Sequence, residues 1–265
     1  MPRGSSQVDW RYDTAALQGR LWTPKLLPAV TLSTWYDFSA IRSLTLDSSS
    51  DVSQINDLSG NGNHATQTTS GNRPHEHLAG TVNVSPYAHG HQQGATCAMV
   101  MNNSLAYTGA NGISIAIAAH FTGVGSTALC GGTTGGLELR SSSGSDIQLL
   151  IRGVAGLVTS TNSTSLTGMA VVGSDTKTNS STVWLNGVST ASGSNPNFTQ
   201  PLTNIFDAVG EQWVGAIGEF LFFNGSILTP RMRNIVDGYL AWKWLCADKL
   251  VASHPFHSRP PLIGD

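Results

Sequence analysis

A chain of 265 residues is long enough for one large all-β domain or two smaller domains, either with a substantial apolar core. Only 11% of the residues are charged and the formal net charge is −2, so the chain lacks the basic surface with which proteins bind nucleic acid or anionic membranes. Its three cysteines are widely spaced and form no CxxC pair, which disfavours a disulfide scaffold and a structural zinc site. The apolar residues form neither a Sec-type signal segment nor a stretch long enough to span a bilayer, so we expect neither.

Residues 1–30 are expected to form an extended N-terminal arm. This segment contains several prolines and scattered aromatic residues, and it shows no sustained hydrophobic period. Its two tryptophans, Trp10 and Trp22, are predicted to anchor the arm against the body of the protein or against a neighbouring chain.

After the arm, the chain divides into short runs that alternate apolar and polar residues or are rich in β-branched residues. Clusters of Gly, Ser, Thr and Asn separate these runs, as expected for turns between strands. The predicted strands cover residues 31–38, 112–121, 146–153, 169–174, 181–190 and 215–223.

Two of these runs carry the clearest signals. The Asn186-Gly187 pair predicts a hairpin with a type I′ turn, because both central residues of that turn need a positive φ. The run of residues 112–121 places five apolar residues on one face, which predicts a strand with one buried side. The residues on that side are Ile113, Ile115, Ile117, Ala119 and Phe121.

One segment is predicted to be a helix. Thr229 is placed to cap its N-terminus, and Pro230 suits the first helical position. We expect at least one of Trp242 and Trp244 to pack against the body, and we expect the proline-rich tail beyond the helix to be extended. The apolar stripe of the helix consists of Met232, Ile235, Val236, Tyr239 and Leu240.

Many short strands, Gly-rich turns and one late helix predict an all-β fold, a two-sheet antiparallel jelly-roll sandwich with an extended N-terminal arm and one C-terminal helix. The arm is assigned to residues 1–30, the sandwich to residues 31–257 and a C-terminal tail to residues 258–265.

Five segments also form a distinctive series along the chain. They are WYDFSAIRSLTLDSSSDVSQINDLSGNGNHATQ (35–67), GNRP (71–74), VWLNGV (183–188), GAIGEFLFFNGSILTP (215–230) and VDGYLAWKWLCADKLVASHPF (236–256). In this order they resemble the concanavalin A-like, laminin-G-like domains of tailed-phage and prophage virion proteins, over most of residues 22–257. The resemblance implies two sheets packed face to face and a phage structural or adhesion component.

Three functions follow from this reading. The leading hypothesis is a non-enzymatic virion protein that decorates the capsid or another particle surface as a homo-oligomer, with other virion proteins and copies of itself as partners. The alternative is a tail or tail-fibre adhesin that binds host surface glycans. The third hypothesis is a glycoside hydrolase. No cofactor is expected, apart from the calcium considered below, and neither nucleic acid nor membrane is an expected partner.

Hydrolysis of a glycosidic bond requires two carboxylates that face each other across the bond. The chain has four glutamates, and none belongs to an E-x-D-x-E array. Glu219 is the closest candidate because it lies on a predicted strand, yet the alternate positions on either side hold Ile217 and Leu221. The sequence therefore favours a protein that is not an enzyme.

The loop DLSGNGNHA offers oxygen ligands for a hard cation such as calcium, from Asp57, Ser59, Asn61 and Asn63. The same residues suit a tight turn without metal, and the turn accounts for more of them than the cation does.

The histidines form two pairs, His75 with His77 and His89 with His91. On an extended strand, residues two apart share a face, so the two pairs are able to enclose zinc or a similar metal. The alternatives are a polar loop that is simply rich in histidine, or a pH-sensitive contact between subunits.

Overall fold

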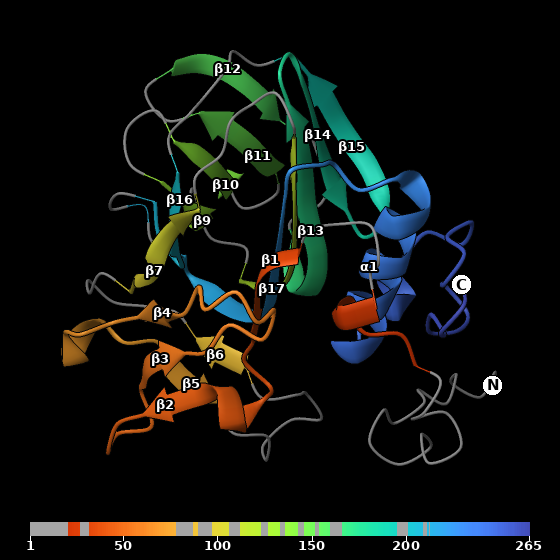
Figure 1. Ribbon diagram of the computed structural model, residues 1–265. Helices are drawn as coiled ribbons and strands as arrows, with labels where there is room; N and C mark the ends of the chain where they lie inside the picture. The colour runs from red at the N-terminus through yellow and green to blue at the C-terminus, as the bar shows by residue number, and fades with distance from the viewer. Residues whose placement is uncertain are drawn as a thin grey trace.

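The computed structural model describes residues 21–26, 32–77, 87–89, 97–105, 112–122, 127–132, 136–142, 146–151, 154–159, 166–194, 201–208, 211 and 213–265. This part of the chain folds into two antiparallel sheets packed face to face, with one α-helix on the outer side of one sheet (Figure 1). The predicted all-β sandwich with a late helix is confirmed.

The sheet that carries the helix is called the helix-side sheet. Its strand order is β15-β14-β13-β8-β17-β6-β5, and β1 pairs with another part of β17. Its strands are β1 (Leu32–Asp37), β5 (His75–His77), β6 (Tyr87–His89), β8 (Ile113–Thr122), β13 (Thr167–Lys177), β14 (Ser180–Leu185), β15 (Val188–Gly193) and β17 (Gly215–Asn224).

The second sheet is called the open sheet, and its strand order is β12-β11-β10-β9-β16-β7-β4-β3-β2. Its strands are β2 (Leu44–Leu46), β3 (Val52–Ile55), β4 (Ala65–Thr66), β7 (Met99–Leu105), β9 (Thr127–Gly131), β10 (Leu137–Ser142), β11 (Asp146–Ile151), β12 (Val154–Thr159) and β16 (Leu202–Ile205). Short 3₁₀ turns are η1 (Pro24–Leu26), η2 (Ile41–Ser43), η3 (Ser70–Asn72) and η4 (Ala247–Lys249).

All six runs predicted as strands belong to these sheets, as β1, β8, β11, β13, the β14–β15 pair and β17. The predicted hairpin is also confirmed, because Asn186 and Gly187 lie between β14 and β15 with φ of 48° and 80°. The turn is further fixed by Val171, whose N–H donates to Asn186 Oδ1 over 2.9 Å.

Strand β8 contributes to two apolar cores, one between the two sheets and one between the helix-side sheet and the helix. Ile115 and Ile117 point into the core between the sheets, as predicted. The expectation that only one side of this strand is buried is wrong, because Ala116 and Ala118 on the other side are buried beneath the helix. Their small side chains allow the helix to approach the sheet, so both faces of the strand are shielded from water.

The helix, α1 (Pro230–Lys243), begins where the sequence predicts, and Thr229 Oγ1 accepts a hydrogen bond from Met232 N over 3.3 Å. The predicted apolar stripe of the helix packs onto β8 and β13 of the helix-side sheet. Trp244 is buried against the body as expected, whereas Trp242 is half-buried and donates to the Phe256 carbonyl over 2.7 Å. Among the described residues, no helix combines the length and the apolar composition needed to cross a membrane.

The tail after α1 is not extended, so that expectation is wrong. Its backbone forms turns, in which His254 N donates to Val251 O over 2.8 Å and His257 N donates to His254 O over 3.0 Å. These turns bring Phe256 back onto α1 at Gly238, where an added Cβ would lie 2.7 Å from Phe256 Cβ. The aromatic ring gains burial by this return, which outweighs the extended preference of the prolines.

Candidate functional site

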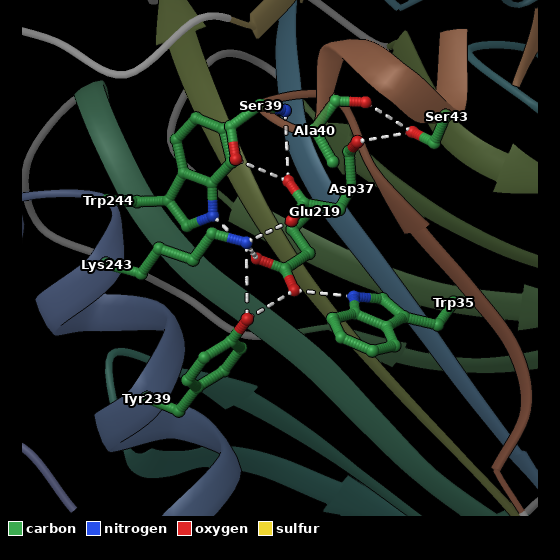
Figure 2. Close-up of polar contacts among 9 residues, drawn as sticks. All are labelled: Trp35, Asp37, Ser39, Ala40, Ser43, Glu219, Tyr239, Lys243 and Trp244. Carbon is green, nitrogen blue, oxygen red and sulfur yellow. Dashed lines mark hydrogen bonds and ion pairs between the residues drawn. The ribbon is translucent and has the colours of Figure 1, made fainter. Parts of the chain in front are cut away.

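Glu219, the glutamate that the sequence marks as a catalytic candidate, lies on the outer face of β17 and exposes none of its surface. Figure 2 shows its carboxylate surrounded by donors from β1 and from the helix region. Oε1 accepts from Trp35 Nε1 over 2.7 Å and from Tyr239 OH over 2.9 Å, and Oε2 accepts from Trp244 Nε1 over 3.0 Å. This carboxylate ties α1 to two strands of the sheet.

A second carboxylate lies close to Glu219, but a lysine joins the two. Lys243 Nζ is 2.7 Å from Glu219 Oε2 and 2.6 Å from Asp37 Oδ2. Burial by itself would lower the pKa of Lys243, whereas Glu219 and Asp37 raise it above the usual value. Burial raises the pKa of Glu219, and Lys243 opposes that rise. The lysine therefore stays charged and is shared by two buried carboxylates.

A second buried ion-pair cluster lies nearer the start of α1. Arg233 is fully buried, pairs with Asp175 of β13, and donates to the carbonyls of Ile115 and Ser174 over 3.1 and 3.2 Å. Its Nη1 is 3.6 Å from Asp237 Oδ1, beyond hydrogen-bond distance. Neither oxygen of Asp237 has a hydrogen-bond partner among the described residues. Burial raises the pKa of Asp237 to about 7, with Arg233 opposing the rise and Asp175 adding to it.

In the loop predicted to bind calcium, the Asp57 carboxylate accepts hydrogen bonds from residues of the loop and of β1. Asp57 Oδ1 accepts from Trp35 N and Ser59 N, each over 2.9 Å. Asp57 Oδ2 accepts from Ser59 Oγ over 2.7 Å and from Asn63 N over 3.1 Å. The amides of Asn61 and Asn63 donate to carbonyls at the start of β1. A cation would have to displace these donors, and calcium binding at this loop stays a prediction.

The two histidine pairs are only partly placed. His75 on β5 is the register partner of His89 on β6, so the backbone brings one residue of each pair together. His75 Nδ1 is 2.8 Å from Asp51 Oδ1. His77 belongs to β5, and His91 lies outside the described residues. Within the described ranges, no three His, Cys, Asp or Glu side chains gather closely enough to hold a metal ion, and the metal hypothesis stays a prediction.

Trp22, one of the two predicted arm anchors, is buried against α1. Its ring meets the Tyr239 ring edge-to-face with centroids 5.5 Å apart. The backbone N–H of Trp22 donates to the Pro261 carbonyl over 3.1 Å, so this part of the arm lies between the helix and the tail. Trp10 lies outside the described residues.

The outer face of the open sheet carries a group of neutral polar side chains, here called the amide face. Register pairs join Gln54 to Thr66, Thr66 to Val100, and Val100 to Asn204, so these residues form one row across β3, β4, β7 and β16. Val100 is 47% exposed and Asn102, two residues further along β7, is also exposed. Amide and hydroxyl groups beside an exposed apolar side chain suit hydrogen bonding to a neutral sugar.

A charged cluster that the sequence did not predict lies on the same outer face, next to the amide face. Arg140 on β10 lies 2.5 Å from Glu211 Oε2 and 3.8 Å from Glu138 Oε1, and its Nε donates to Gln148 over 3.0 Å. Glu138 is the register partner of Gly131, which also pairs with Asn204 of the amide face. The two glutamates are far apart in sequence, and no local motif announces their convergence on one arginine.

No family model matches the sequence, and no curated protein matches it. Among solved structures, Domain 4 of AbnA, a GH43 extracellular arabinanase from Geobacillus stearothermophilus, in complex with arabinotriose, matches at 16% identity with a TM-score of 0.50, covering 77% of this chain and 97% of that one. The binding domain of Paraclostridial Mosquitocidal Protein 1 matches at 11% identity and a TM-score of 0.54, and covers 78% of this chain. An arabinofuranosidase complexed with arabinofuranosyl-alpha-1,2-xylobiose matches at 14% identity and a TM-score of 0.52, and covers 81% of this chain.

This chain spans 52% of the mosquitocidal protein chain and 60% of the arabinofuranosidase chain. At these identities the likeness shows the fold alone, which is a β-sandwich of the jelly-roll type.

Proposed function

We propose that this chain is a non-catalytic domain that binds neutral glycans through the amide face. The observation that carries this proposal is the row of uncharged amide and hydroxyl side chains on the outer side of the open sheet. Support also comes from Domain 4 of AbnA, which shares the fold and was solved in complex with arabinotriose.

The chemistry of the amide face favours neutral sugars. An amide side chain offers both donors and an acceptor, so Asn102 and Asn204 are each able to bond two neighbouring hydroxyls of a sugar ring. Val100, which is exposed, is the register partner of Asn204 and lies two residues before Asn102 on β7, and it offers apolar contact to the C–H side of the ring. Neighbours on the other side of the strands, such as Met99 and Ile205, are buried in the core and hold these positions rigidly.

The carboxylates in this structure favour binding without catalysis. Glu219 is buried beneath the helix and occupied by four donors, counting Lys243. Glu138 and Glu211 lie on either side of Arg140, which partly neutralises them. Neither arrangement offers an unshared acid and base across a cleft, as glycoside hydrolysis requires.

Binding to a panel of neutral polysaccharides, measured by affinity electrophoresis and by titration with soluble oligosaccharides, tests the proposal. The double variant Asn102→Ala with Asn204→Ala should weaken binding by about tenfold or more, because hydrogen bonds to the sugar are lost. Ser192→Ala, at an exposed position of β15 in the other sheet, should bind as the wild type does. Failure of the wild type to bind any neutral glycan at about millimolar sugar, or unchanged binding by the double variant, would overturn the proposal.

We also propose that the domain works at the surface of a phage particle as a homo-oligomer. Its support is the sequence resemblance to tailed-phage virion proteins. Cryo-electron microscopy of particles, with the mass of the purified protein in solution, tests this placement. We expect density on the capsid exterior and a mass of several chains. Density confined to the tail tip would contradict capsid decoration in favour of the adhesin alternative, and a monomeric mass would contradict self-assembly.

A further inference from the structure

A hollow of about 410 Å³ opens between the first half of α1 and the tail, on the opposite layer of the sandwich from the amide face. The helix contributes Arg231, Asn234 and Ile235 to its lining. The tail contributes Pro255, Phe256 and Arg259, together with Asp265. Its volume falls within the range of pockets that bind small ligands. It combines an apolar floor with polar groups at the surface.

The tail already holds one carboxylate in this hollow. Arg259 and Asp265 form a two-pronged pair, with Nη1 2.7 Å from Oδ2 and Nη2 2.8 Å from Oδ1. The guanidinium also lies 5.3 Å from the centroid of the Phe256 ring. Hydrogen bonds from Arg259 lower the pKa of Asp265 to about 2, so this carboxylate is charged at any ordinary pH. The place therefore accommodates a carboxylate in the fork geometry that arginine favours.

A second arginine at the hollow, Arg231, forms no ion pair with a side-chain carboxylate among the described residues. Arg231 is exposed on the first turn of α1, and its Nη2 makes a long contact of 3.4 Å to the Gly264 carbonyl. Two guanidinium groups thus face one side-chain carboxylate among the lining residues. Asn234 lies one turn further along the same side of the helix and adds an uncharged donor and acceptor.

We propose that this hollow binds a carboxylate-bearing sugar unit of a glycan. The carboxylate of the sugar pairs with Arg231, its hydroxyls bond to Asn234, and its ring lies over Ile235, Pro255 and Phe256. Asp265 partly neutralises the hollow and competes with the ligand for positive charge. This inference rests on the proposed function, because it assumes a glycan ligand. It concerns a different face of the protein and a sugar with a negative charge, whereas the amide face is proposed to bind neutral sugars.

Calorimetric titration at low salt with trigalacturonate, and with its fully methyl-esterified form as the matched neutral ligand, tests the inference. The free acid should bind about tenfold more tightly than the ester, because only the acid pairs with Arg231. Arg231→Gln should weaken binding of the acid by about fivefold or more and leave binding of neutral oligosaccharides unchanged. Asp265→Asn should tighten binding of the acid several-fold, because it removes the competing charge and keeps an oxygen for the Leu262 N–H.

The outcomes separate this inference from the proposed function. Equal affinity for acid and ester, or no effect of Arg231→Gln, would overturn the hollow as a site. Loss of acid binding in the double variant of Asn102 and Asn204, with Arg231→Gln unaffected, would assign the acid to the amide face and also overturn it. Inorganic phosphate should not displace trigalacturonate at equal concentration, and full displacement would show an unselective anion site, contrary to the proposal.

Discussion

Replacing Lys243 with Met should lower the free energy of unfolding by about 3–5 kcal/mol, because it leaves two buried carboxylates facing each other without a cation. In the native protein the Lys243 ammonium lies within 2.7 Å of both Glu219 and Asp37 (Figure 2). Burial prevents water from taking over its role. Chemical denaturation followed by tryptophan fluorescence measures the loss, since Trp35 and Trp244 both donate to Glu219.

Two further variants separate the charge from the packing. Adding Glu219→Gln to Lys243→Met should recover part of the lost stability, because one uncompensated charge is removed and an oxygen remains for Trp35. Lys249→Met, whose ammonium donates to a carbonyl at an exposed site, should change stability by less than about 1 kcal/mol. A Lys243→Met protein as stable as the wild type, or no recovery in the double variant, would show that the buried ion pair does not hold the helix.

The sequence predicted those parts of the fold that short-range patterns determine. Apolar residues at alternate positions located β8, the Asn186-Gly187 pair located a hairpin, and Thr229 with Pro230 located the start of α1. Each of these signals arises within about ten residues, from side-chain period, positive φ or helix capping.

The open sheet shows where such patterns failed. None of the six predicted strands falls on β2, β3, β4 or β7, where the amide face begins. In β7 the alternation Met99, Val100, Met101 is followed by two asparagines, which usually indicate a turn. Pairing with β4 and β16 supplies the hydrogen bonds that keep this segment extended. The candidate glycan site therefore depends on contacts between distant segments, and no local signal predicts it.

The surroundings of Glu219 were not predictable from the sequence, for a related reason. A glutamate on a strand has the same local pattern whether it faces a cleft or the underside of a helix. Its partners Trp35 and Lys243 lie 184 and 24 residues away in sequence, so its surroundings are set by tertiary packing alone. Alternation predicted one buried face of the sheet, but the small residues Ala116 and Ala118, which admit α1 to the other face, carry no strong apolar signal.

Asp237→Asn should stabilise the protein at alkaline pH, although it removes a charge next to a buried arginine. Asp237 is 1% exposed, and its pKa rises from 3.8 to about 7 on folding. The folded protein thus holds this proton more tightly than the unfolded chain does. Stability from this group is fully present below about pH 4 and is lost as the pH rises toward and through 7. One unit of pKa is worth about 1.4 kcal/mol, so the loss is on the order of 4 kcal/mol above pH 8.

Unfolding free energies of the wild type and Asp237→Asn, measured at pH 5 and pH 8.5, test whether ionisation of Asp237 destabilises the folded protein. The variant has no carboxylate to ionise, so it should be more stable than the wild type by about 1–2 kcal/mol at pH 5 and by about 4 kcal/mol at pH 8.5. Taking the difference between the two proteins cancels the titration of other groups, including His120 and His254, whose pKa values burial lowers. A variant less stable than the wild type at pH 8.5 would mean that Arg233 needs both carboxylates, and that the 3.6 Å separation still supplies a net favourable ion pair.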